Sequence, residues 1–360
     1  MSHALLPPSS AEQWVNCPGW ASMTEGLRDT EESEAARIGT KVHNLCAEVL
    51  TGELQDPIIL YTEEELECAK VYADYCENLV STYDLSSPFV EHHLKMPSIH
   101  EENSGTPDFV LINRKRGIIH VVDYKHGYGI VEATWNWQLL NYLVGVQDTF
   151  KLDLSEFSCT LTIVQPRAFH QFGTVRSWCP SNRDISKAIS KLWESAGRAT
   201  SNAPTCNAGS HCKYCEALFM CPSATQKGMD VFDTITLAKR LDLSESALSL
   251  QYDLVGEALS LFKNLQVSLE AQMVGRLKEG KSIPNYRMEG KSGNLEWAVT
   301  NEEAISFGDI MGIDLRKPSS PITPTQAKKK GLDVEGLTSR SIGVKLTKFD
   351  LQNAQRIFKI

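Results

Sequence analysis

The sequence lacks long apolar runs and an excess of basic residues. No apolar stretch approaches the roughly 20 residues that cross a bilayer, and neither end has the basic-then-apolar pattern of a signal segment. We therefore expect a cytoplasmic protein with no membrane partner. Lys and Arg number 36 against 45 Asp and Glu, a net charge of −9. This balance argues against a non-specific coat on nucleic acid, although a local basic groove is compatible with it.

Internal repeats and low-complexity tracts are also absent. With 42% hydrophobic and 22% charged residues, the composition is that of a globular protein and excludes a fibrous or disordered chain. A length of 360 residues favours a core with an appendage. Because the compartment is expected to be reducing, clustered members of the ten cysteines indicate metal ligands before disulfides.

Hydrophobic periodicity predicts alternating helices and strands. Helical spacing indicates a helix over 31–50, and the pair Thr62 and Glu65 is a capping-box signature for another. Further predicted elements are a strand over 89–96, a hairpin of 108–112 and 117–125, a helix over 134–146, a strand over 160–165, and helices over 185–196 and 244–277. This order predicts an α/β core with a mixed sheet.

Two carboxylates and a lysine are expected to meet in that sheet. Asp123 and Lys125 lie two apart on a strand, so their side chains share a face, and Asp108 begins the partner strand. Carboxylate oxygens suit Mg²⁺ or Mn²⁺, which phosphodiester hydrolysis needs. Lys125 would orient or deprotonate the attacking water, or offset charge in the transition state.

Taken alone, an Asp-x-Lys pair is more often an exposed surface pair. The apolar run at 118–122 just before it favours a central strand instead, whose end delivers the pair to a cleft.

Three motifs together resemble the RecB-like branch of the PD-(D/E)XK nucleases. They are Gly-Thr-Pro-Asp ending at Asp108, Asp-Tyr-Lys from Asp123 to Lys125, and Gln-Leu-Leu-Asn-Tyr from Gln138 to Tyr142. The match covers about 37–222 and implies a restriction-endonuclease-like core, a mixed sheet flanked by helices, in a Mg²⁺- or Mn²⁺-dependent deoxyribonuclease. It implies catalytic roles for Asp108, Asp123 and Lys125.

The same resemblance extends to a histidine and to one helix face. The segment Gly39-Thr-Lys-Val-His43 matches the family's Gly-x-x-x-His setting, so the implied metal ligands are His43, Asp108 and Asp123. Gln138 and Tyr142 lie four apart on one helix face, where the family contacts DNA and supports the site. Glu91 is a weaker candidate, because strand alternation turns it away from the apolar side.

A second constellation consists of cysteines. Cys212 and Cys215 form a C-x-x-C pair and Cys221 follows in the same loop, a spacing typical of metal sites. The fourth ligand is open: Cys17 precedes a Pro-Gly turn, whereas Cys206 would complete a local four-cysteine zinc site.

One cysteine before the core and three after it resemble the iron-sulfur branch of RecB-like nucleases. That branch includes AddB-type helicase-nucleases and CRISPR-associated adaptation exonucleases. The resemblance implies a [4Fe-4S] cluster on Cys17, Cys212, Cys215 and Cys221, acting as a staple. The segment around Trp14 and the cysteine loop also resemble a phage and prophage family of this superfamily. This implies a phage enzyme of DNA recombination, replication or degradation in the cytoplasm of an infected or lysogenic bacterium.

The domain division predicted from these patterns has four parts. Residues 1–30 supply a cluster cysteine, 31–200 form the nuclease core, 201–225 the cysteine loop, and 226–360 a mainly helical region. That last region could serve as a DNA clamp, a dimer interface or a docking surface for a phage recombinase or single-strand-binding protein.

Three functions compete for the whole chain. The first is an active nuclease, with an exonuclease favoured. The second is a catalytically silent DNA-binding or recombination-accessory protein that keeps the fold. The third is a zinc-stabilised structural protein of a phage particle. The first is favoured, because no carboxylate or lysine of the motifs is missing.

Overall fold

The computed structural model describes residues 4–27, 34–53, 61–83, 88–237, 244–315, 323–329 and 331–348. By its internal contacts the chain divides into two compact units, residues 1–268 and 269–360. Within the described ranges, no helix is both long enough and apolar enough to cross a membrane.

The first unit is built around a five-stranded mixed sheet with the strand order β1-β4-β5-β6-β7. Strands β5 and β6 pair in parallel, and the other neighbours are antiparallel. The strands are β1 (Phe89–Val90), β4 (Phe109–Asn113), β5 (Ile118–Tyr124), β6 (Ser158–Val164) and β7 (Val175–Trp178). The expected hairpin is therefore present as β4 and β5.

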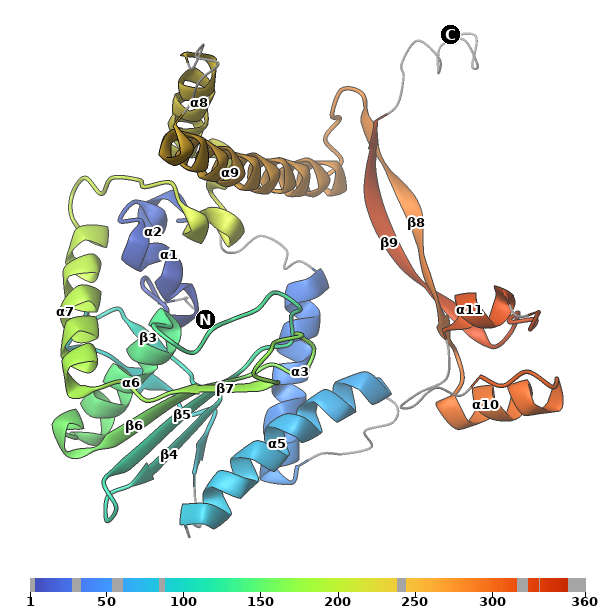
Figure 1. The fold of residues 1–360 in the computed structure, drawn as a ribbon, viewed down its shortest axis with the longest axis horizontal. Helices are drawn as coiled ribbons and strands as arrows, with labels where there is room; N and C mark the ends of the chain where they lie inside the picture. The colour runs from blue at the N-terminus through green and yellow to red at the C-terminus, as the bar shows by residue number, and fades with distance from the viewer. Residues whose placement is uncertain are drawn as a thin grey trace. The chain divides into compact units, whose positions relative to one another are not determined.

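Helices cover both faces of this sheet (Figure 1). Helices α6 (Trp137–Phe150) and α7 (Asn182–Ala199) lie on one face, and α3 (Glu34–Thr51) and α5 (Glu63–Tyr83) on the other. Because successive side chains of a strand point to opposite faces, β5 contributes to both cores. Ile119 and Val121 belong to the α6 side, whereas Val122 and Tyr124 belong to the α3 and α5 side. The mixed α/β fold with a helix-flanked sheet is confirmed.

Helix caps and one ion pair fix the positions of helices α3, α5 and α6. The predicted capping box at the start of α5 is present: the Thr62 N–H donates to the Glu65 carboxylate (2.7 Å), and the Glu65 N–H donates to the Thr62 hydroxyl (3.2 Å). Lys41 of α3 reaches the same Glu65 carboxylate at 2.7 Å. Asn136 caps α6 by accepting from the Leu139 N–H.

The strand predicted over 89–96 is interrupted, so that prediction is wrong. Strand β1 ends at Val90, and the chain resumes as β2 (Leu94–Lys95), which pairs with β3 (Ser104–Gly105) in a separate small sheet. Between them Glu91 has a φ of 47°, a left-handed conformation that non-glycine residues seldom adopt. Two short strands joined by such a bend show the same alternation as one long strand, so the sequence could not distinguish them.

The N-terminal segment packs on the α6 and α7 side. It contains the short helices α1 (Ala11–Asn16) and α2 (Trp20–Met23), and its Trp14 and Trp20 side chains are buried in the larger core. The hydroxyl of the buried Ser195 in α7 donates to the Val15 carbonyl oxygen (3.2 Å). This packing leaves Cys17 at the end of α1, facing the loop that follows α7.

Much of the expected C-terminal helical region is present as α8 (Pro222–Leu237) and α9 (Glu245–Lys278). The second unit, however, also contains a long antiparallel pair, β8 (Tyr286–Trp297) and β9 (Thr338–Lys348), with a bulge near Ser292. Helices α10 (Asn301–Ile310) and α11 (Pro324–Lys329) belong to the same unit. The strand pair was not predicted. Its strands lie far apart in sequence, and the alternation of apolar residues in β8 is interrupted around Gly290 and Gly293.

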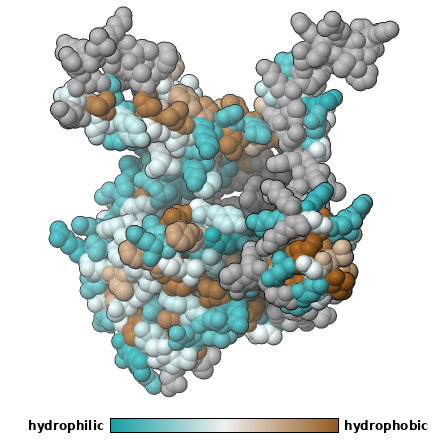
Figure 2. Space-filling view, turned by 45° about the vertical axis from the view of Figure 1, so that its right-hand side comes forward, coloured by the Kyte–Doolittle hydropathy of each residue, from teal (hydrophilic) through white to brown (hydrophobic). Residues whose placement is uncertain are grey.

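Hydrophobic residues on the visible surface lie scattered among hydrophilic ones (Figure 2). Exposed large apolar side chains include Leu248, Leu250 and Tyr252 of α9. Further exposed apolar side chains follow along the same helix: Leu259, Phe262, Val267 and Leu269.

A buried histidine gives the fold a testable pH dependence. His120 in β5 is buried, packs 5.2 Å from the Tyr83 ring, and within the described ranges neither ring nitrogen has a hydrogen-bond partner. Burial therefore lowers the pKa of His120 below its ordinary 6.5. As the pH falls below the ordinary pKa of 6.5, His120 takes up a proton in the unfolded chain but not in the folded chain. The free energy of unfolding therefore decreases as the pH falls.

We predict that the free energy of unfolding, measured in urea, falls between about pH 7 and about pH 5, and that His120→Leu reduces this fall. The variant His93→Leu, at an exposed histidine, is the control and should retain it. An unchanged slope in His120→Leu would show that other groups cause the acid sensitivity.

Candidate active site

Three side chains of metal-ligand type form a compact group at one end of the sheet. His43 of α3, Glu91 after β1 and Asp108 before β4 each place one ligand atom within 4.8 Å of the others. His43 Nδ1 lies 3.2 Å from Asp108 Oδ1. A carboxylate-rich group with one imidazole suits a hard divalent cation.

The backbone bend at Glu91 is what brings that carboxyl group into the site. The Glu91 N–H donates to the Asp108 carbonyl oxygen (3.2 Å), which holds the bend next to the aspartate. Burial and the nearby Asp108 carboxylate raise the pKa of Glu91 to about 7. The group therefore concentrates more negative charge than its surroundings neutralise, a condition that a bound cation relieves.

Asp123 and Lys125 at the end of β5 adjoin this group. The Tyr124 N–H, between them in sequence, donates to Asp108 Oδ2 at 2.6 Å. Lys125 Nζ lies 2.8 Å from Asp123 Oδ2, as the shared strand face predicts. Asp108, Asp123 and Lys125 are thus brought together, as the hairpin register requires.

Gln138 of α6 bonds to both charged partners. Its amide nitrogen donates to Asp123 Oδ1 (2.8 Å), and its amide oxygen accepts from Lys125 Nζ (2.9 Å). The Tyr142 hydroxyl, one turn further along α6, lies 3.5 Å from the same amide nitrogen. Tyr142 is only 4% exposed, so its position suits support of Gln138.

The ionisation of the pair follows from its surroundings. Burial and the Asp108 carboxylate raise the pKa of Asp123, against the opposing pull of Lys125. Burial alone would lower the pKa of Lys125, but the Asp123 and Asp108 carboxylates outweigh it and raise the pKa. Lys125 therefore stays an ammonium, a hydrogen-bond donor and positive charge at the edge of an acidic group.

The cysteines singled out in the sequence meet around a small cavity. Its lining includes Cys17, Cys206, Cys212, Cys215 and Cys221. The Asn207 N–H points at Cys17 Sγ and the Gly209 N–H at Cys212 Sγ, each at 3.4 Å. None of these cysteines is in a disulfide.

This donor set fits a thiolate-bound metal group. Soft sulfur donors from two distant segments converge, and backbone N–H groups directed at sulfur stabilise the negative charge of thiolates. Burial raises the pKa of Cys206 and of Cys215 to about 12, so a metal would have to displace their protons. Cys206 also packs against Gly19, where a Cβ atom would lie 2.5 Å from its Sγ.

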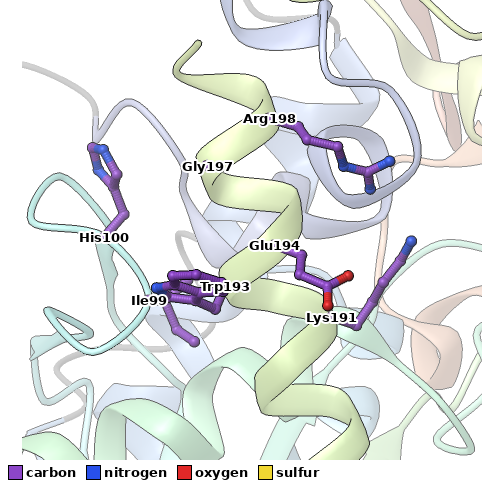
Figure 3. Close-up of a pocket in the computed structure, with 7 residues that line it drawn as sticks. All are labelled: Ile99, His100, Lys191, Trp193, Glu194, Gly197 and Arg198. Carbon is purple, nitrogen blue, oxygen red and sulfur yellow. The ribbon is translucent and has the colours of Figure 1, made fainter.

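A separate cavity lies beside α7 (Figure 3). Trp193 and Ile99 lie to one side of α7, while Lys191 and Glu194 lie on its other side. None of the residues that line it belongs to the acidic group or to the cysteine group.

Of the residues at the site, Glu91 was the one that sequence reasoning undervalued. Its bend depends on a φ angle that no pattern of side chains indicates. The contribution of the Tyr124 backbone N–H was also missed, since a backbone donor carries no residue-type signal.

A comparison with protein-family models gives a match over residues 3–308 to the family described as "Protein of unknown function (DUF2800)". Among solved structures, a candidate exonuclease from Eubacterium rectale is similar at 11% identity and a TM-score of 0.37, over 56% of this chain and 84% of that one. The protein SSO0001 is similar at 14% identity and a TM-score of 0.35, over 62% and 88% of the two chains. Likenesses at this level leave the function to be argued from the chain's own residues.

We predict that Glu91→Gln weakens Mn²⁺ binding by about tenfold or more, because it removes a charged oxygen ligand while keeping the side-chain shape. Isothermal titration calorimetry measures the affinity, with Glu101→Gln as the matched control at an exposed glutamate. Binding as tight as that of the wild type would exclude Glu91 as a ligand.

Proposed function

The chain belongs to the DUF2800 family, and we propose that it is a metal-dependent deoxyribonuclease of the PD-(D/E)XK type. One observation carries the proposal: the Lys125 ammonium, held by Asp123 and Gln138, lies at the same sheet end as the compact group of His43, Glu91 and Asp108. In an ordinary surface Asp-Lys pair, the carboxylate is exposed and no side-chain amide bonds to both residues, as Gln138 does here.

His43, Asp108 and Asp123 are the proposed ligands of Mg²⁺ or Mn²⁺, with Glu91 as a further one. The side chains fit this group because they supply hard oxygen donors and one imidazole, with more negative charge than Lys125 balances. Such a cation neutralises charge on the phosphoryl oxygens and lowers the pKa of a bound water.

Lys125 acts as a donor in this account. Its neighbours Asp123 and Asp108 raise its pKa, which favours the ammonium form. Its ammonium orients the attacking water or stabilises the negative charge that develops on the scissile phosphate. Asp123 and Gln138 fix its position through contacts of 2.8 and 2.9 Å.

Gln138 couples the helix to the chemistry. Because one amide bonds to both Asp123 and Lys125, a shift of α6 would displace both charged groups together. Tyr142 supports that amide from within the core.

We propose that the enzyme acts on DNA ends as an exonuclease, in recombination, replication or degradation of phage DNA.

The cysteine group is proposed to hold a [4Fe-4S] cluster on Cys17, Cys212, Cys215 and Cys221. Support comes from the convergence of both segments on one cavity and from the N–H groups directed at Cys17 and Cys212. When bound, the cluster would tie the N-terminal segment to the loop after α7. Its role would be structural.

We predict that Lys125→Ala and Asp123→Ala each lower the cleavage rate of linear DNA by about 100-fold or more. The first removes the positive charge at the reacting phosphate, and the second removes a proposed ligand of the metal ion. End-labelled linear and circular DNA, incubated with Mg²⁺ or Mn²⁺, give both the rate and the polarity. Lys115→Ala, at an exposed turn lysine, is the matched control and should cleave as the wild type does. Full activity in Lys125→Ala would contradict the proposed site.

Anaerobically purified protein is predicted to contain iron and acid-labile sulfide in place of zinc. Cys215→Ser should lose the iron and lower the unfolding temperature by several degrees, since metal binding contributes to folding. Cys179→Ser, at an exposed cysteine outside the group, should retain both.

Comparison of Cys17→Ser with Cys206→Ser identifies the fourth ligand. The proposal expects iron loss only in Cys17→Ser. Zinc as the native metal, or iron loss only in Cys206→Ser, would contradict the assigned ligand set.

A further inference from the structure

Exposed aromatic side chains gather at the sheet end that carries Asp123 and Lys125. Tyr128, three residues after Lys125, is 66% exposed, and Phe169 and Phe172 in the loop after β6 are 93% and 76% exposed. Because β5 and β6 are parallel, the loops that follow them leave the sheet at the same edge. The Lys125 N–H still bonds to the Val164 carbonyl oxygen (2.9 Å) at that edge.

These two loops are fixed to each other by a buried amide. Gln165 is fully buried, and its side-chain nitrogen donates to the carbonyl oxygens of Gly127 (2.7 Å) and Gly129 (2.8 Å). Its side-chain oxygen accepts from the Val131 N–H (3.1 Å) and from Arg176 (2.5 Å). The aromatic side chains therefore extend from a hydrogen-bonded framework.

Two cations lie over aromatic rings in the same region. The Arg167 guanidinium is 4.1 Å from the centre of the Tyr128 ring and bonds to its hydroxyl. In the cysteine loop, Lys213 Nζ is 4.9 Å from the centre of the Tyr214 ring. A Cβ atom built on Gly129 would lie 3.7 Å from the Tyr214 hydroxyl oxygen and 3.8 Å from Lys213 Nζ. The cysteine loop thus adjoins the loop that follows the catalytic strand.

We call Tyr128, Phe169, Phe172 and Tyr214 the aromatic rim. Flat rings next to Arg and Lys on a rigid frame are the features with which proteins bind single-stranded nucleic acid, since bases stack on the rings and cations bind the phosphates. The bases of an intact duplex are already stacked inside the helix, so the rim offers a duplex no equivalent contact.

We infer that the aromatic rim binds single-stranded DNA by stacking its unpaired bases beside Lys125. This deepens the proposed function and rests on it, because it names unpaired DNA as the substrate class. It also gives the cysteine loop a second role, in which Lys213 and Tyr214 contact the bound strand. Arg167 orients Tyr128, and the ion pair between Arg167 and Glu64 (2.9 Å) fixes the position of Arg167.

The test measures the affinity of the full-length protein for DNA by fluorescence anisotropy, with Ca²⁺ in place of Mg²⁺. The probes are a labelled mixed-sequence oligonucleotide, its blunt duplex, and an RNA of the same sequence. The double variant Phe169→Ala/Phe172→Ala is compared with Trp193→Ala, a matched exposed aromatic on α7 outside the rim (61% exposed).

The inference predicts that the double variant loses about tenfold or more in affinity for the single strand, while its affinity for the duplex changes by less than about twofold. Trp193→Ala should match the wild type on both. Unchanged single-strand affinity in the double variant, or an equal loss on both DNAs, overturns the rim. Tighter binding of RNA than of DNA overturns DNA as its ligand.

Cleavage assays separate this inference from the proposed function. If the wild type cleaves DNA with Mn²⁺ but the rim variant binds single strands normally, only the inference fails. If the wild type neither cleaves nor binds DNA, both fail.

Discussion

The contact between the Asp123 carboxylate and the Lys125 ammonium is the constraint on which the site depends. Asp123 is 1% exposed, so removing its charge from water is costly, and an ion pair in such a place persists only when further hydrogen bonds satisfy it. Gln138 supplies those bonds from α6, and its own placement depends on Tyr142 and on the cap at Asn136. The packing of α6 on the sheet therefore fixes two charged groups at the end of β5, the geometry on which the proposed hydrolytic site rests.

Around that pair the charges do not balance. Lys125 offsets Asp123, but Asp108 and Glu91 lie beside them, and the His43 imidazole contacts Asp108 at 3.2 Å. Burial and, after it, the Asp108 carboxylate raise the pKa of Glu91. A divalent cation bound by these carboxylates would offset their mutual repulsion.

The sequence sufficed where local rules determine geometry. Side chains two positions apart on a strand share a face, and this rule placed Asp123 beside Lys125. The capping box of α5 could likewise be predicted from Thr62 and Glu65. It failed where geometry depends on long-range contacts. The bend at Glu91 is held by Asp108, seventeen positions away, and the strand pair in the second unit joins segments about 40 residues apart. Motifs indicated which residue types would act, but the partner that completes each group came from tertiary structure.

Metal-dependent cleavage of DNA by the wild-type protein tests the central claim most directly. Linear DNA is incubated with the protein and Mn²⁺, then with excess chelator, and finally with Mn²⁺ restored, while the release of end label is followed. The account predicts that cleavage starts with Mn²⁺, stops on chelation and resumes when the ion returns. Cleavage that continues in chelator, or no cleavage by protein with an intact metal group at its cysteines, would contradict it.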